Sequence, residues 1–190
     1  RRDIAVLVRT HAHGKATQEA LANRGIPCVR HSQDDVYRSV AAGHLRRLLV
    51  AMLSPRHRTA VGAAFASIVC GMDAIELRAL QRDEVAWDTA QRTLRRLARR
   101  WREKGIDPAL REAFGEYGTF EKVLAREDGD RIATNLRHLA ELLHSAERTL
   151  HLRPAALLRW LEDGIAGVET KGQKDGPDDR QLRLETDADA

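Results

Sequence analysis

Two kinds of hydrophobic pattern divide this chain. Residues 3–8 carry an unbroken apolar run, which is typical of a parallel strand buried on both faces. A helical pattern follows and stops at Gly25, and residues 26–29 predict a second short strand. The sequence therefore predicts one β-α-β unit. Because two parallel strands do not make a stable sheet alone, we expect the missing strands to lie outside this chain or to return from its far end.

Beyond this unit, the apolar positions recur at helical spacing. A capping-box pattern at residues 32–35 predicts the start of a long helix, and Pro55 follows its end. The apolar stripe of this helix consists of Val36, Val40, Leu45, Leu48, Leu49 and Met52. Further helices are predicted over residues 59–69, 73–82, 85–104, 107–115, around Phe120, 134–150 and 154–165. Residues 36–166 are thus expected to form an all-helical body.

Several helix ends have sequence signals of their own. Asp73, with Glu76 three residues later, predicts a capped N-terminus, and Gly105 predicts the end of the preceding long helix. Asp107 followed by Pro108 predicts the N-cap and the first helical position of the next helix.

The composition changes again after the helical body. Residues 167–180 are rich in Gly, Lys and Asp, which predicts a flexible linker, and residues 181–190 predict a strand that returns to the sheet. The predicted fold class is therefore mainly α, with a helical domain inserted into a fragment of a parallel α/β domain.

Composition narrows the class of protein. Hydrophobic residues make up 43% of the chain, charged residues 32% and aromatic residues only 4%, so the core must consist mainly of Leu, Ala and Val. The net charge of +4 makes a nucleic-acid partner only modestly more favoured than not. Of the 32 basic residues 27 are Arg, which matches phosphate geometry but can equally reflect genomic base composition. Cys28 and Cys70 match no metal-ligand or redox spacing. We find no signal-peptide pattern and no apolar run of the ~18 residues that a membrane span needs, so we expect no membrane partner and a cytoplasmic location.

Residues 6–13 read Val-Leu-Val-Arg-Thr-His-Ala-His, an apolar strand followed by a polar turn. This segment resembles the apolar strand followed by Arg-Ser/Thr-Asn-Ala that opens a segment of domain 2A in superfamily 1A DNA helicases, the group of UvrD, Rep, PcrA and RecB. Residues 83–88, 101–105, 131–143 and 181–187 resemble the RecB family in particular, where the last of these leads into helicase motif V.

This resemblance implies a domain assignment. Residues 1–35 would be a β-α-β piece of the RecA-like domain 2A, residues 36–166 the helical domain 2B, and residues 181–190 a strand returning to 2A. The parent protein would be an ATP-dependent helicase-nuclease of double-strand-break repair, which uses ATP and Mg²⁺ and works with RecC- and RecD-like subunits. This part would orient duplex DNA or a partner subunit relative to the motor. The alternative is a free-standing helical protein-interaction module with no DNA role.

The first candidate site lies at the carboxyl end of the predicted first strand, where open α/β sheets bind ligands. The resemblance implies that Arg9, Thr10 and His11 contact single-stranded DNA there. His11 departs from the family's Asn. It keeps a hydrogen-bond donor and has a ring able to stack on a base, but the bidentate contacts of an amide are lost. The alternative is that Arg9 only makes ion pairs at the sheet edge.

The second candidate site is the turn Gly71-Met72-Asp73, which aligns with a Gly-Ile-Gly motif of the family that touches the duplex backbone. Glycine lets backbone N–H groups approach a phosphate at a helix N-terminus. Asp73 departs from this pattern, because its carboxylate caps the helix but repels a phosphate. A plain capped turn is the favoured interpretation, and a remaining contact through Gly71 and Met72 is the alternative.

The third candidate site is an arginine stripe on the helix predicted over residues 85–104. Its members fall on one helical face: Arg92, Arg95, Arg96, Arg99 and Arg100. Such a stripe suits a phosphate backbone. Taken by itself, however, a solvated helix face is the better interpretation, and contact with a partner subunit is a third.

The sequence contains no motif for ATP hydrolysis or for nuclease chemistry. Residues 14–17 do not form a Gly-x-x-x-x-Gly-Lys-Ser/Thr phosphate loop, and Asp83-Glu84 open a helix instead of closing a strand. His11 and His13 have no further ligand residue nearby, which argues against a metal site. We therefore expect no catalytic residue, metal or cofactor in this chain.

Overall fold

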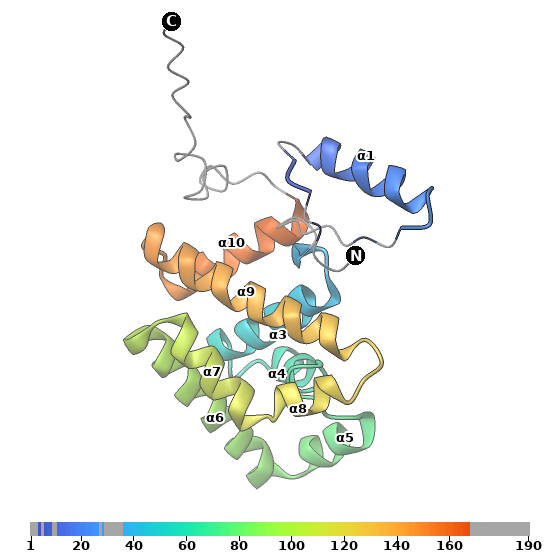
Figure 1. The fold of residues 1–190 in the computed structure, drawn as a ribbon. Coiled ribbons are helices and arrows are strands. Elements are labelled where there is room, and N and C mark those ends of the chain that lie inside the picture. Colours follow the sequence, from blue (N-terminus) through green and yellow to red (C-terminus); the bar gives the residue numbers. More distant parts are fainter. Residues whose placement is uncertain (1–3, 5, 9–10, 27, 29–35, 168–190) are drawn as a thin grey trace, which may run out of the picture.

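The computed structural model describes residues 4, 6–8, 11–26, 28 and 36–167, and all regular secondary structure within these residues is helical (Figure 1). The helices are α1 (His11–Ala22), α3 (Val40–Leu53), α4 (Arg58–Phe65), α5 (Ala74–Arg82), α6 (Glu84–Lys104), α7 (Ile106–Glu116), α8 (Thr119–Leu124), α9 (Gly129–Thr149) and α10 (Pro154–Ala166). The prediction of a mainly α chain is therefore confirmed. Among the described residues, no helix has the length and apolar character to cross a membrane.

The expected first strand does not form where the structure describes it. Ile4 and residues 6–8 have no regular structure, and Leu7 is 97% exposed. Ile26 and Cys28, in the expected second strand, are also irregular. A strand forms only by hydrogen bonding to a neighbouring strand, and the described residues contain none. The assignment of residues 1–35 to a domain 2A piece stays a prediction, and residues 168–190, which hold the expected linker and returning strand, lie outside the described residues.

The first long helix is interrupted where its sequence pattern predicted continuity, and the predicted capping box at residues 32–35 lies outside the described residues. Val36 and Tyr37 are helical, but the chain breaks at Arg38 and Ser39 before α3 begins. The Ser39 hydroxyl accepts a hydrogen bond from the Ala42 amide and thereby caps the helix, as short hydroxyl residues do. The break turns Val40 outward, so that it is 63% exposed and does not belong to the buried stripe.

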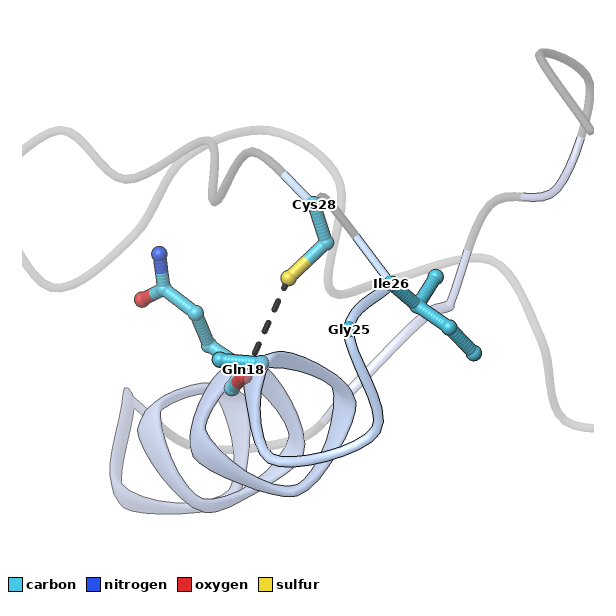
Figure 2. A pocket seen from close by; sticks show the side chains of 5 residues that line it. Gln18, Gly25, Ile26 and Cys28 are labelled. Atoms are coloured by element: carbon cyan, nitrogen blue, oxygen red, sulfur yellow. Dashed lines mark hydrogen bonds between the residues drawn. The ribbon is translucent and has the colours of Figure 1, made fainter.

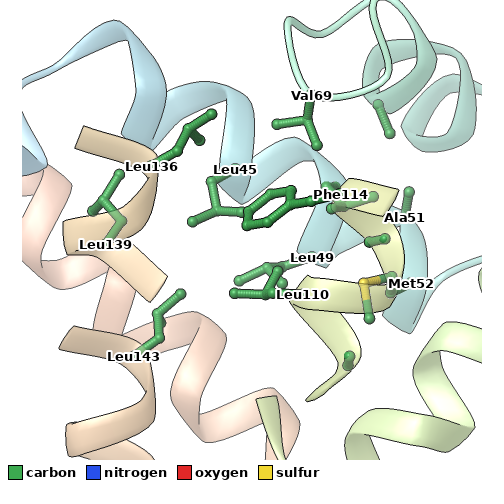
Figure 3. Packing of buried hydrophobic residues seen from close by; sticks show 14 of the residues in the cluster. Leu45, Leu49, Ala51, Met52, Val69, Leu110, Phe114, Leu136, Leu139 and Leu143 are labelled. Atoms are coloured by element: carbon green, nitrogen blue, oxygen red, sulfur yellow. The ribbon is translucent and has the colours of Figure 1, made fainter. Parts of the chain in front are cut away.

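Helix α3 lies at the centre of the helical body and packs against α4, α6, α9 and α10. Its Leu45, Leu49 and Met52 meet side chains of α7 and α9 (Figure 3). The labelled side chains from those two helices are Leu110, Phe114, Leu136, Leu139 and Leu143. Full burial of each such side chain contributes roughly 1.5–3 kcal/mol to folding. The leucine-rich core expected from the low aromatic content is therefore confirmed.

Capping residues in the sequence predicted some helix ends correctly and others wrongly. Asp73 and Glu76 form the predicted capping box of α5, and α6 ends at Gly105, which has a φ of 90°. The prediction that Asp107 is an N-cap was wrong, because α7 already begins at Ile106. The Asp107 carboxylate lies inside the first turn and instead pairs with Arg111 at 2.8 Å.

Two other helix boundaries were also predicted wrongly. Helix α9 begins at Gly129, before the predicted start at Thr134, whose hydroxyl donates to the Asp130 carbonyl. The start of α9 lies so close to α8 that a Cβ at position 129 would overlap the Val123 carbonyl oxygen. Glycine, which has no Cβ, allows this close approach. Helix α4 ends at Phe65, and the chain then forms the turns that lead to α5.

Candidate nucleic-acid interface

Helix α6 separates its apolar and basic residues onto opposite sides. Leu94, Leu97 and Trp101 are at most 1% exposed and face the core. The five predicted stripe residues are all exposed: Arg92, Arg95, Arg96, Arg99 and Arg100. The structure thus places the stripe on the surface, as the helical spacing predicted. Whether this surface meets DNA stays a prediction.

Two of the five arginines are held by acidic residues of α7. The Arg96 guanidinium donates to Glu116 at 2.7 Å and lies 3.4 Å from Glu112. Arg100 lies 3.4 Å from the other oxygen of Glu112. The hydrogen bond to Glu116 and the nearby carboxylates raise the pKa of Arg96. Arg96 and Arg100 therefore join α6 to α7 and have part of their charge already balanced.

The remaining arginines differ in how far their charge is balanced. Arg92 pairs with Asp88 at 3.2 Å, one helical turn away. Arg95 donates only to the neutral Gln91 side chain at 3.3 Å. Arg99 makes no hydrogen bond or ion pair within the described part of the chain. Arg95 and Arg99, four residues apart on α6, therefore carry the unbalanced positive charge of the stripe.

A further arginine belongs to the same side of the helix. Arg102 follows Arg99 by three residues, is exposed, and likewise makes no ion pair among the described residues. Sequence analysis did not include it, although the three-residue spacing from Arg99 was a sufficient signal. The available cations thus extend along Arg95, Arg99 and Arg102 toward the end of α6.

The turn before α5 uses its backbone amides internally. The Gly71 amide donates to the Ser67 carbonyl at 2.7 Å, and the Met72 amide donates to the Phe65 carbonyl at 3.0 Å. The Asp73 carboxylate accepts from the amides of Ile75 and Glu76 at 2.7 and 2.8 Å. This geometry supports the favoured interpretation of a capped turn. A DNA contact at Gly71 and Met72 stays a prediction, and it would have to use other groups than these amides.

Lys122 supplies a positive charge at the same turn. Its amino group donates to the Cys70 carbonyl at 2.8 Å, and a Cβ on Gly71 would lie 2.8 Å from its Cδ atom. Gly71 is therefore required both by its φ of 69° and by the Lys122 side chain across it. Because Lys122 is distant in sequence and comes from α8, no local pattern indicated this residue.

The cysteine in this turn has no reactive character. Cys70 is 1% exposed, and burial raises the pKa of its thiol to about 12. A thiol of this kind is protonated near neutral pH and is a poor nucleophile. Among the described residues, no group of three His, Cys, Asp or Glu side chains is placed to hold a metal ion.

The N-terminal candidate site falls mostly outside what the structure describes. Arg9 and Thr10 lie outside the described residues, and His11 is the first residue of α1. Beside α1 there is an open hollow lined by Gln18, Ala22, Gly25, Ile26 and Cys28, in which the Cys28 thiol lies 3.9 Å from the Gln18 carbonyl oxygen (Figure 2). Among the described residues, those that line this hollow carry no charge. The single-strand contact stays a prediction.

Comparison with known proteins identifies relatives over nearly the whole chain. The chain is 31% identical over 186 residues to the RecBCD enzyme subunit RecB of Escherichia coli K12. It is 32% identical over 186 residues to the same subunit of Haemophilus influenzae, and 34% identical over 187 residues to that of Mycobacterium tuberculosis H37Rv. No protein-family model matches the chain.

These matches cover nearly all of this chain but only a small part of each RecB subunit. They include 97% of this chain but only 15% of the Escherichia coli subunit, and 98% of this chain but 16% of the Mycobacterium tuberculosis subunit. The matched region therefore contains the α6 arginines and the Gly71 turn. Similarity of this extent shows that the chain belongs to the RecB family, as a segment related to about 15% of a RecB subunit.

Proposed function

We propose that this chain is a non-catalytic accessory part of a RecB-like ATP-dependent DNA helicase-nuclease that acts in double-strand-break recombinational repair. In this proposal residues 36–166 are domain 2B, inserted into a RecA-like domain 2A that includes residues 1–35 and 181–190, with residues 167–180 as a flexible linker. The similarity to RecB across both flanks and the helical body supports this arrangement. ATP and Mg²⁺ would bind elsewhere in the parent protein.

The role proposed for the helical body is to orient duplex DNA relative to the motor. The observation that carries it is the unbalanced charge of Arg95 and Arg99 on the outer side of α6. Guanidinium groups that have no acidic partner bind phosphate without first breaking an ion pair. In this proposal Arg92, Arg96 and Arg100 flank the contact and contribute less, because Asp88, Glu112 and Glu116 already balance them.

The other two candidate sites contribute to the same proposal. Arg9, Thr10 and His11 would hold single-stranded DNA at the edge of domain 2A. At the turn of Gly71 and Met72, the Lys122 amino group would supply the charge for a duplex phosphate, since the amides of the turn are already bonded.

The test is salt-dependent binding of the 190-residue chain to a forked DNA duplex. Each phosphate contact that is lost lowers the slope of log affinity against log salt by roughly one. We expect Arg95→Gln with Arg99→Gln to lower the slope by about two and to weaken binding without regard to DNA sequence. The matched control is Arg96→Gln with Arg100→Gln, which removes the same charge from the paired side of α6. Equal slopes for both variants and the unaltered chain would reject the proposed DNA contact.

A protein-interaction module without a DNA role is the second candidate function. The exposed outer face of α5, described below, is the observation that favours it. No binding to a forked duplex at low salt, together with binding to a partner protein, would support this alternative. If the chain is instead part of a RecB-like helicase-nuclease, its expected protein partners are RecC- and RecD-like subunits. The chain would then bind both DNA and protein.

A further inference from the structure

Helix α5 is exposed over an entire face. Although α5 has nine residues, none of them is buried, and only Leu77 and Leu80 are partly covered by the core. On the opposite side Ile75 is 79% exposed. Figure 1 shows α5 at the edge of the helical body, next to the start of α6. A helix this short is marginal by itself, so its outward face is a surface that a partner can cover and stabilise.

This outward face combines apolar and basic residues. Ala74, Ile75, Arg78, Ala79 and Arg82 surround a shallow hollow of about 270 Å³. Single exposed apolar residues are common on protein surfaces, but here Ile75 and Ala79 lie one turn apart beside the hollow. The outer face of α5 is therefore a small apolar surface flanked by the guanidinium groups of Arg78 and Arg82.

The charge of this face is not balanced within the described residues. Arg78 and Arg82 are exposed and make no hydrogen bond or ion pair there. Acidic side chains at both ends of the helix are already engaged. Glu76 accepts from the Asp73 amide at 2.9 Å, Asp73 caps α5, and Asp83 accepts from the Val85 and Ala86 amides at the start of α6. The face is thus complementary to a surface that carries carboxylates.

The apolar centre distinguishes this face from the arginine stripe of α6. A phosphate backbone gains nothing from contact with Ile75, whereas an amphipathic protein segment buries it. A second copy of the same face is a poor occupant, because a symmetric pairing would set Arg78 and Arg82 against their own copies. The observations therefore favour a protein partner with acidic and apolar residues.

We propose that the outer face of α5 docks an acidic amphipathic helix of another protein. Its apolar side chains would pack on Ile75 and Ala79, and its carboxylates would pair with Arg78 and Arg82, since Arg matches carboxylate geometry in two-pronged pairs. That this protein is another subunit of the RecB-like assembly rests on the proposed function.

The test is site-specific photocrosslinking in the assembled parent enzyme. With benzoylphenylalanine in place of Ile75, we expect a crosslink to a partner-subunit segment in which Asp or Glu residues flank apolar ones at helical spacing. The matched control places the same probe at Val40, which is 63% exposed on α3. A crosslink to DNA, to a segment without acidic residues, or to no partner subunit would overturn the proposal, as would capture of the same segment from Val40.

A second measurement separates this inference from the DNA proposal. We expect Arg78→Gln with Arg82→Gln to weaken the affinity for the crosslinked subunit by about tenfold or more, and to leave the salt slope for forked duplex unchanged. A Glu→Lys change in the partner segment should weaken binding to the unaltered protein. Unchanged subunit affinity in the α5 variant would overturn the docking proposal, whereas loss of the Arg95 and Arg99 effect would overturn only the DNA role.

Discussion

Trp101 of α6 and Glu147 of α9 are joined by a hydrogen bond across the helical body. The indole Nε1 donates to Glu147 Oε1 at 3.0 Å, and the other oxygen of this carboxylate accepts from the Ile106 amide at 2.7 Å. A Cβ on Gly105 would lie 2.8 Å from that second oxygen. One carboxylate therefore fixes the corner between α6 and α7, and with it the direction of the arginine stripe.

We predict that Glu147→Ala destabilises the fold. The substitution leaves the buried Trp101 indole and Ile106 amide without an acceptor, and each unsatisfied buried donor costs roughly 1–3 kcal/mol. The free energy of unfolding in urea should fall by at least about 2 kcal/mol. Glu141→Ala, at an exposed position of the same helix, is the control and should change it by less than about 0.5 kcal/mol. Equal stabilities of the two variants would show that the corner does not depend on Glu147.

Gly129 at the start of α9 gives a second stability prediction. In Gly129→Ala the new Cβ would overlap the Val123 carbonyl oxygen and lie 2.9 Å from the Leu124 Cα. Because these are backbone atoms that cannot rotate away, we expect a loss of about 1–3 kcal/mol. Gly115→Ala is the matched control, since a Cβ there has no neighbour within 4 Å and alanine favours the helix by about 1 kcal/mol. Thermal unfolding of both variants should show opposite shifts.

His44 predicts a pH dependence of stability. Its Nδ1 accepts from the Ile68 amide at 3.3 Å and faces Arg47 of its own helix at 3.2 Å. Burial, followed by Arg47 and Arg126, lowers the pKa of His44 below its ordinary value of 6.5. The unfolded chain then binds the proton more readily than the folded one, so stability is full above pH 6.5 and decreases as pH falls toward the lower folded pKa.

The matched variant for this prediction is His44→Asn. The amide oxygen of Asn can accept from the Ile68 amide but does not titrate. Urea unfolding between pH 7.5 and pH 5 should therefore show a shallower loss of stability in the variant than in the unaltered protein. The same pH profile for both proteins would contradict the assignment to His44.

Local sequence signals predicted the parts of the fold that depend on neighbours along the chain. The Asp73 and Glu76 capping box and the end of α6 at Gly105 were correct, because each involves residues within one helical turn. The start of α7 was not, because Ile106 is fixed by Glu147 from α9, which no local pattern reveals. The expected strands could not be confirmed from the described residues, because a strand requires a partner from outside its own segment.

The arginine stripe of α6 was likewise predicted only as far as it depends on neighbours along the chain. Helical spacing correctly placed the arginine stripe on one exposed side of α6. It did not predict that Glu112 and Glu116 of α7 balance Arg96 and Arg100, because that pairing depends on how two helices pack. Nor did it indicate that Lys122 lies against Gly71. Sequence analysis therefore identified the surface, and tertiary contacts determine which of its charges are available.

If acidic residues of α7 withhold Arg96 and Arg100 from DNA, removing those acids should release them. We predict that Glu112→Gln with Glu116→Gln raises the affinity for forked duplex and steepens its salt slope by up to about two, one for each arginine released. The free energy of unfolding should change by less than about 1 kcal/mol, because all four side chains are partly exposed.

The control for this prediction must change the net charge equally. Glu127→Gln with Glu141→Gln removes two exposed carboxylates that make no ion pair among the described residues. A general charge effect would strengthen DNA binding in both double variants alike, whereas release of the arginines would steepen the slope only in the α7 variant. A slope that stays constant in the α7 variant would mean that Arg96 and Arg100 do not face the duplex. The DNA contact would then be confined to the side of α6 that holds Arg95, Arg99 and Arg102.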